Sequence, residues 1–225
     1  MLFATDHGDR SAFLLAVGVA LVLIGVLGDR IEVESFELLG AKLRVREVVK
    51  SRLELAESPT RGQAGDAVAL RRQAAALQRL AGVYGLYEHV RHMQPPGPER
   101  TGVLDQISEH MQDAGREAEF DPAEVMSWFH QGTDALRVIA LNLMLVNEDY
   151  RDLLAVLESI DAPHSLFEQY YGLLLADAMV GDLDSLQRQL LADAISRAQR
   201  KRRFRNDDDL PSLSAHVLAA LTRDA

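Results

Sequence analysis

The chain has 225 residues, a formal net charge of −10 at pH 7 and no cysteine. The lack of cysteine excludes a disulfide framework and a Cys-based zinc site, and the acidic balance argues against general nucleic-acid binding, which needs a basic face. Hydrophobic residues make up 48% of the chain but aromatic residues only 6%. This composition is typical of helices that pack on one another, so we expect a mostly α protein.

The first notable stretch is the apolar run at residues 12–28, AFLLAVGVALVLIGVLG, which has no charged, amide or hydroxyl side chain. Its length is at the lower end of the roughly 17–25 residues that cross a bilayer as a helix. A removable signal peptide is the alternative, but the leader carries Asp6 and Asp9 against Arg10, and no Ala-x-Ala site follows the run. We therefore predict an uncleaved transmembrane helix.

The charges on the two sides of this run predict its orientation. Only Arg10 precedes it, whereas a group of basic residues follows it: Arg30, Lys42, Arg44, Arg46, Lys50 and Arg52. Positive charge favours the cytoplasmic side of a membrane. We expect a single-pass protein of the inner (plasma) membrane, with residues 1–11 outside and the C-terminal domain in the cytoplasm.

The same run also has a pattern of small residues. Ala16 and Ala20 are spaced for close helix approach, and Gly18 and Gly25 are one heptad apart. A homodimer through the transmembrane helix is therefore a possible assembly.

Residues 29–60 form a juxtamembrane segment before the main domain. Within it, residues 31–46 alternate apolar and charged side chains around a turn at Leu39-Gly40, which predicts a small β-hairpin. The alternative is one amphipathic helix that continues into residues 48–57, because short apolar runs are ambiguous. Residues 58–62, SPTRG, interrupt either structure.

Residues 61–225 have the apolar spacing of a helical domain. Asp121-Pro122 is a helix start signal, because aspartate is a good N-cap and proline suits the first helical position. The helix after Gly132 is apolar on nearly all sides, so we expect it in the core. The predicted helices are residues 66–93, a helix from a Thr101 cap to about 118, one that starts at Asp121-Pro122 and leads into Gly132, one after Gly132 that is closed by residues 147–149, and then about 150–160, 165–180, 183–203 and 212–222.

Short helices joined by tight turns indicate a HEAT- or TPR-like bundle. Residues 134–160 and 167–195 have similar spacing, but they share few identities, and no TPR signature is present. We expect helical-repeat-like packing without a detectable sequence repeat.

Four strings resemble a helical module of uncharacterised bacterial, actinobacterial-type, single-pass membrane proteins. They are YEHVR (87–91), PPGPERT (95–101), GTDALRVIALNLM (132–144) and SLFEQYYGLL (165–174). The last contains the more specific motif, Ser-x-Phe-Glu-Gln-Tyr, and departs from the pattern at Tyr171, where histidine is more usual. The resemblance implies a helical module in a signalling or conflict-system context, and it implies no activity.

Few residues suggest site chemistry. Arg137 and Glu168 are expected to form a buried ion pair that joins two helices, since buried charges need partners. His89 and His92 have a spacing that can hold a metal, but no third ligand is evident beside Glu88, so a solvated polar face is the simpler interpretation. Phosphate-loop, nucleophile-elbow and zinc-protease motifs are lacking. We assign no catalytic, cofactor-binding or metal-binding residue and expect no cofactor.

The strongest surface feature in the sequence is a basic run near the C-terminus. It binds anionic lipid headgroups or an acidic partner in one interpretation. In the other, its cations complement the dipole at a helix end and Asp207–Asp209 balance them locally. The members of the basic run are Arg197, Arg200, Lys201, Arg202, Arg203 and Arg205.

Together these patterns predict a membrane-anchored helical module that binds a protein partner and no nucleic acid, acting as an adaptor or signalling component. One alternative is a membrane-bound enzyme that uses an interhelical pocket of acidic and histidine side chains. Another is a structural subunit of a membrane assembly.

Overall fold

The computed structural model describes residues 64–205 and 207–223. The chain divides into two units, residues 1–46 and 47–225, and every described residue belongs to the second. The predicted transmembrane helix at 12–28, the hairpin at 31–46 and the break at 58–62 therefore lie outside the described residues. Within the described ranges, none of the helices has the length and apolar character needed to span a bilayer.

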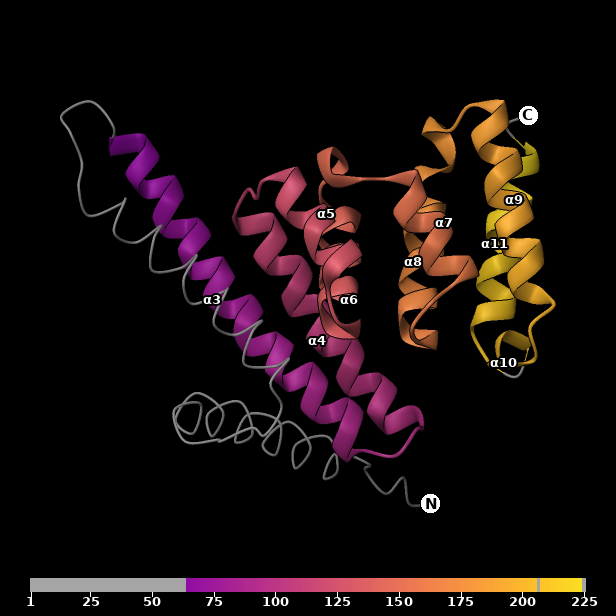
Figure 1. Cartoon of the computed structure of the whole chain (residues 1–225), viewed down its shortest axis with the longest axis horizontal. Coiled ribbons are helices and arrows are strands. Elements are labelled where there is room, and N and C mark those ends of the chain that lie inside the picture. Colours follow the sequence, from indigo (N-terminus) through magenta and orange to yellow (C-terminus); the bar gives the residue numbers. More distant parts are fainter. Residues whose placement is uncertain (1–63, 206, 224–225) are drawn as a thin grey trace, which may run out of the picture. The chain divides into compact units, whose positions relative to one another are not determined.

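The described residues are mostly helical and include no strand, which confirms the mostly α prediction for this part of the chain (Figure 1). The helices in chain order are α3 (Ala64–Met93), α4 (Pro98–Glu117), α5 (Pro122–Gln131), α6 (Asp134–Val146), η1 (Glu148–Tyr150), α7 (Leu153–Asp161), α8 (Leu166–Met179), η2 (Val180–Asp182), α9 (Ser185–Gln199), α10 (Arg202–Arg205) and α11 (Leu210–Arg223).

The helix-start signal at Asp121-Pro122 is confirmed. The Asp121 side chain accepts a hydrogen bond from the Ala123 N–H, and Pro122 is the first residue of α5. The start of the preceding helix was misplaced: α4 begins at Pro98, and the Thr101 hydroxyl, which was expected to cap it, donates instead to the Gly97 carbonyl. Proline is favourable in the first helical turn, where its missing N–H is not needed.

The predicted helix over residues 183–203 is also wrong at its end. Helix α9 ends at Gln199, and the short helix α10 follows with Phe204 buried. Because burial of this aromatic side chain requires a change of direction, the basic run extends over two helices instead of one.

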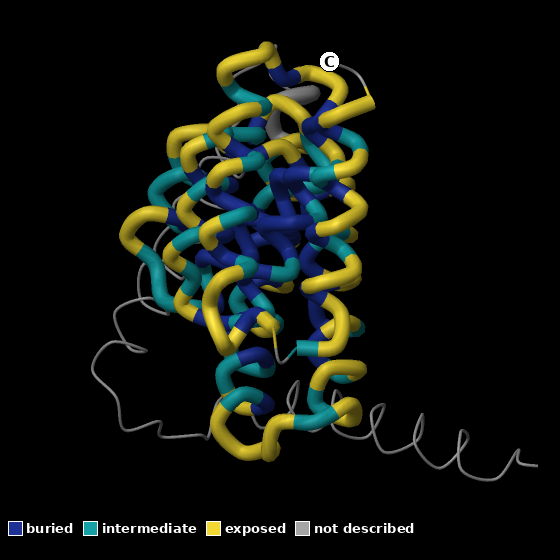
Figure 2. The backbone as a smooth tube through the Cα atoms, turned by 90° about the vertical axis from the view of Figure 1, so that its right-hand side faces the viewer, coloured by how far each residue is buried: buried dark blue, intermediate teal, exposed yellow. Residues whose placement is uncertain are grey.

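The helices pack as consecutive hairpins. Helix α3 packs on α4, α5 on α6, α7 on α8, and α9 on α11. Neighbouring hairpins contact one another through α4, α6, α8 and α11, and also through α7 and α9. Buried residues gather between the helices, while the outer faces are exposed (Figure 2).

Helix α6 is the centre of this core, as its apolar sequence predicts. Nine of its 13 residues are buried, including the polar side chains of Arg137 and Asn142. It contacts α3, α4, α5 and α8. A charged residue in the most enclosed helix needs partners from its neighbours, and Arg137 has them.

Candidate functional site: a buried arginine that joins four helices

Arg137 and Glu168 lie together in the core, from α6 and α8. The Arg137 side chain is 2% exposed and that of Glu168 is 0% exposed. The Nε and Nη2 atoms of Arg137 both donate to Oε1 of Glu168, at 3.0 and 2.7 Å. The structure thus brings together the two residues that the sequence pairs.

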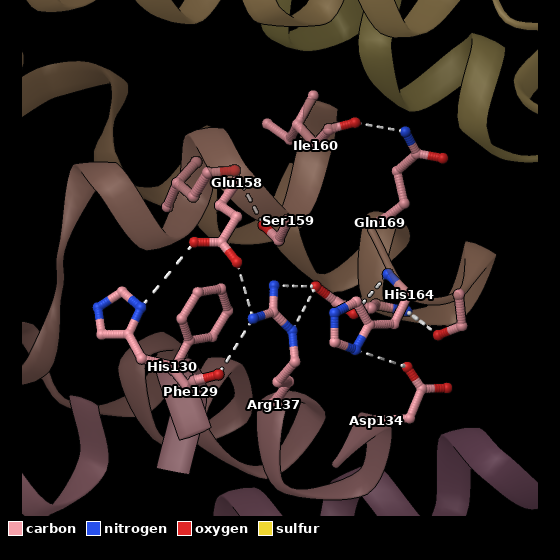
Figure 3. Close-up of polar contacts among 12 residues, drawn as sticks. Phe129, His130, Asp134, Arg137, Glu158, Ser159, Ile160, His164 and Gln169 are labelled. Atoms are coloured by element: carbon pink, nitrogen blue, oxygen red, sulfur yellow. Dashed lines mark hydrogen bonds and ion pairs between the residues drawn. The ribbon is translucent and has the colours of Figure 1, made fainter. Parts of the chain in front are cut away.

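The third guanidinium nitrogen extends the contact to two more helices. Arg137 Nη1 donates to Oε1 of Glu158 in α7 at 2.9 Å and to the carbonyl of Phe129 in α5 at 3.1 Å (Figure 3). The guanidinium carbon also lies 4.0 Å from the centroid of the Phe129 ring, in cation–π geometry. One side chain therefore links α5, α6, α7 and α8.

The electrostatics keep this arginine charged. Burial acts to lower the pKa of Arg137, but its hydrogen bonds to Glu168 and Glu158 outweigh burial, and the pKa is raised. Removing one partner of a buried ion pair of this kind is costly, even where the net contribution of the pair to stability is small.

Glu168 also fixes the turn between α7 and α8. Its second oxygen, Oε2, accepts from the backbone N–H of His164 at 2.9 Å. Its own N–H donates to the hydroxyl of Ser165, the N-cap of α8. Both carboxylate oxygens are therefore used, one toward α6 and one toward the turn.

The remaining residues of the Ser-x-Phe-Glu-Gln motif also have architectural contacts. The Phe167 ring packs against Tyr87 and Tyr171, with centroids 5.9 and 5.0 Å away. The Gln169 side chain donates to the carbonyl of Ile160 at 2.6 Å. Burial raises the pKa of Tyr171 to about 12, so its hydroxyl stays neutral. These contacts account for Phe167 and Gln169 as part of the packing of α8 against α3 and α7.

Two histidines lie at the edge of the network. His130 Nδ1 is 3.9 Å from Glu158 Oε2, and His164 Nδ1 is 4.0 Å from Asp134 Oδ1. Asp134, His164 and Glu168 each offer a ligand atom, and these atoms lie within 4.8 Å of one another. Sequence reasoning missed this group, because nothing in the spacing of the three residues marks them as neighbours.

The charges around this group favour pairing over cation binding. Asp134 Oδ2 is 2.8 Å from Arg91, and Glu168 is held by Arg137. A cation here would face two guanidinium groups, and like charges at this range oppose its binding. The arrangement is suited to holding helices at fixed positions.

His89 and His92, whose spacing could hold a metal, lie on a polar part of α3. His92 Nδ1 lies 2.7 Å from the Glu88 carbonyl oxygen and 3.5 Å from the Glu88 carboxylate. His89 is exposed on the same helix. The group of described side chains that could share an ion does not include either histidine.

The basic run divides into two parts. Arg197 donates to Asp161 at 2.9 Å, and Lys201 lies 3.2 Å from the same carboxylate. Burial acts to raise the pKa of Asp161, but these two cations outweigh it and the pKa is lowered. The remaining members are exposed and form no ion pair within the part of the chain that the structure describes: Arg200, Arg202, Arg203 and Arg205.

The acidic residues that follow do not balance those arginines by direct pairing. Asp207 accepts from the N–H groups of Asp209 and Leu210, and so caps the start of α11. Within the described ranges, no ion pair joins Asp207–Asp209 to the arginines. The four arginines are thus available to a partner.

A scan against protein-family models, a search of curated proteins and a search of solved structures each gave no match. The fold and the site define the described part as an all-α domain of packed helical hairpins. Its central polar cluster is the buried Arg137–Glu168 ion pair, with further hydrogen bonds from Arg137 to Glu158 and to the Phe129 carbonyl.

Proposed function

We propose that this protein is a membrane-anchored helical interaction module, an adaptor or signalling component that presents a cytoplasmic domain to a protein partner. The apolar run at residues 12–28 supports the anchor, and the basic residues after it support the orientation. The central ion pair supports a binding role over catalysis, because its polar atoms are committed to packing.

We also infer that the hairpins form a helical-repeat-like stack of the HEAT or TPR type. Each hairpin contacts the next through equivalent helices: α6 contacts α8, α8 contacts α11, and α7 contacts α9. Such stacks present one layer of helices as an extended recognition surface. In this chain, α7 and α9 belong to such a layer.

Three exposed leucines on the neighbouring helices α7 and α9 carry the proposal. Leu154 is 69% exposed, Leu186 is 64% exposed and Leu190 is 44% exposed. We refer to these three residues as the leucine face. Apolar side chains grouped on a surface commonly mark an interaction site, whereas single ones are normal.

The contact between Asp161 and Arg197 aligns the two helices that carry this face. Leu154 is seven residues before Asp161 in α7, and Leu190 is seven residues before Arg197 in α9. Seven residues are about two helical turns, so each leucine lies on the same side of its helix as the ion pair. Helices α7 and α9 run in the same direction (Figure 1), so counting back two turns from the Arg197–Asp161 contact leads to Leu154 on one helix and Leu190 on the other.

Site-specific photo-crosslinking in cells tests this function. A photoreactive residue replaces Leu186 in the full chain, and a matched control replaces Met93, which is 70% exposed on α3. We expect position 186 to capture one protein that position 93 does not. Capture of the same proteins from both positions, or of the chain alone, would contradict the proposal.

The enzyme alternative is favoured by one observation, the proximity of Asp134, His164 and Glu168. Calorimetric titration of the full chain with Zn²⁺ or Mn²⁺ tests it, with His164→Ala as the comparison. Binding that depends on His164 would favour an enzyme. Titrations without binding would remove the metal-dependent form of this alternative, because no other group in the described part of the chain could share an ion.

A further inference from the structure

We propose that the leucine face binds a basic amphipathic α-helix of the partner protein. This inference rests on the proposed function and adds the chemistry of the partner. The charges that surround the leucines carry it.

The leucine face is bordered by aspartates. Asp193 is exposed, three residues after Leu190, and so lies on the same side of α9 as Leu186 and Leu190. Asp184 is exposed as well, directly before α9, and its side chain accepts from the Gln187 N–H. Within the described ranges, neither Asp184 nor Asp193 forms an ion pair.

On the α7 side of the leucine face, the charged residue nearest to Leu154 in the sequence is also an aspartate. Asp152 is the N-cap of α7, two residues before Leu154, and its side chain accepts from the Ala155 N–H. The cation beside it, Arg151, is mostly buried and lies within 3.6 Å of Glu148 and Asp182. Three carboxylates, those of Asp152, Asp184 and Asp193, therefore lie beside the leucines. The cations Arg197 and Lys201 lie about two turns further along and pair with Asp161.

An α-helix is the element that fits this arrangement. Leu186 and Leu190 are four residues apart on one helix, and Leu154 lies on the neighbouring helix. Packed helices lie about 8–10 Å apart, so side chains on two neighbouring parallel helices can contribute to one surface. An amphipathic helix places apolar residues at three- and four-residue steps and can pack its apolar stripe against such a surface.

The border determines which helix binds. Lysine or arginine residues beside the apolar stripe of the partner would meet Asp152, Asp184 and Asp193. An acidic helix would be repelled, since juxtaposed like charges are unfavourable across an interface. The same aspartates disfavour anionic lipid headgroups as the occupant.

Fluorescence anisotropy with two labelled peptides tests the inference. The full chain is reconstituted in nanodiscs of zwitterionic lipid, and empty nanodiscs are the blank. The probes are an amphipathic Leu/Lys helix and a Leu/Glu helix with the same apolar face. We expect the Leu/Lys peptide to bind with a Kd on the order of micromolar, weakening with salt, and the Leu/Glu peptide not to bind.

Two pairs of variants identify the surface. Leu186→Gln with Leu190→Gln is expected to weaken Leu/Lys binding about tenfold or more. The matched control is Met93→Gln with Val68→Gln on α3, where the native side chains are 70% and 48% exposed, and it is expected to leave binding unchanged. Asp184→Asn with Asp193→Asn should weaken binding and its salt dependence while keeping the N-cap, because asparagine caps as well as aspartate.

Equal binding of both peptides, or Leu/Lys binding that is unaffected by Leu186→Gln with Leu190→Gln, would overturn the inference. In that case, continued capture of one protein from position 186 in cells would still support the proposed interaction module, with a partner of different chemistry. Loss of specific capture would instead contradict the proposed function.

Discussion

Arg137 is the residue with the largest expected influence on stability. It is a long cationic side chain at 2% exposure, with partners on three other helices. Removing one partner of such a group leaves an uncompensated charge in the core, which costs more than the net value of the pair. Arg137→Met should therefore be severe, because Glu168 would stay buried without its cation.

A double-mutant cycle measures this contact. We expect Arg137→Met to lower the free energy of unfolding by about 3–5 kcal/mol. Adding Glu168→Gln should cost clearly less than the sum of the single changes, because the two side chains share one interaction. Urea unfolding followed by Trp128 fluorescence is a direct measurement, since Trp128 is the chain's one tryptophan and adjoins Phe129.

A surface pair provides the control for the cycle. Arg79 in α3 bonds Glu117 in α4, and both side chains are about half exposed. Arg79→Gln and Glu117→Gln should each change stability far less than Arg137→Met, because exposed ion pairs are screened by solvent. If the Arg137 and Glu168 changes were additive, direct pairing in the core would be refuted.

The stability contributed by Glu88 should depend on pH with the opposite sign to that of a salt-bridged carboxylate. Burial, followed by the nearby Asp134 charge, raises the pKa of Glu88, while His92 and Arg91 oppose the increase. The folded state thus holds this proton more tightly than the unfolded state. The associated stability is present below the unfolded pKa and is lost as the pH rises through the folded pKa.

Glu88→Gln should therefore make the protein more stable than the wild type at pH 7, and the gain should disappear near pH 4. The measurement is the difference in Tm at the two pH values. It is made in a His92→Gln background, because His92 lies 3.5 Å from this carboxylate and is one of the groups that act on the Glu88 pKa. A gain of equal size at both pH values would show that burial of the charge is not the cause.

At the scale of elements, α7 and α8 depend on close backbone approach. A Cβ atom added at Gly172 would lie 2.1 Å from the Ser159 hydroxyl oxygen and 2.9 Å from its Cβ. Ser159 is buried and donates to the Val156 carbonyl, so it cannot move freely. The small residue sets the distance between these two helices.

Gly172→Ala should lower the free energy of unfolding by about 1–3 kcal/mol through overpacking. Ser159→Ala in the same chain should recover part of the loss, because it removes the nearer atom. Gly82→Ala is the control: that glycine is exposed in α3 with nothing within 4 Å, and alanine there should add about 0.5–1 kcal/mol. Urea unfolding of the three variants compares them, and equal effects at Gly172 and Gly82 would contradict close packing.

Many of the helices and their ends could be predicted from the sequence, because local signals determine them. Asp121-Pro122 and Gly132 defined α5, and the apolar faces of α6 marked the core. The two errors have a physical origin. Pro95 and Pro96 lie outside a helix, but Pro98, two residues later, starts α4. Beyond Gln199, the chain forms the separate helix α10, whose buried Phe204 depends on tertiary packing.

Of the candidate site, only the ion pair between Arg137 and Glu168 could be predicted from the sequence. Arg137 and Glu168 stood out because each is a charge within an apolar stripe. Glu158, the Phe129 carbonyl and the neighbours Asp134 and His164 did not stand out, because they join the network through the crossing of α5, α6 and α7. Sequence spacing carries no record of such crossings.

At the scale of the whole molecule, we expect the unpaired arginines of the basic run to hold the domain against an anionic membrane. Each basic residue near such a surface contributes about 1 kcal/mol. The chain has no cysteine, so Asp208→Cys gives a single labelling site on an exposed residue beside the run. A dye there reports contact through quenching by spin-labelled lipid headgroups.

Quenching should be stronger in vesicles with phosphatidylglycerol than in purely zwitterionic vesicles. It should fall with Arg202→Gln and Arg203→Gln. Arg71→Gln and Arg72→Gln remove two exposed charges from α3 and serve as the matched control. Quenching that is equal in both lipids would assign the arginines to an acidic partner instead.

The central ion pair has one more consequence, for the way the chain folds. Proteins built of stacked hairpins can start to fold at any unit and then extend to the neighbouring units. Here the Arg137 charge takes its partners from the hairpin before the turn at Tyr150 and from the hairpin after it. A half-assembled stack would bury that charge without Glu168, so residues 122–179 should gain protection from hydrogen exchange in a single cooperative step.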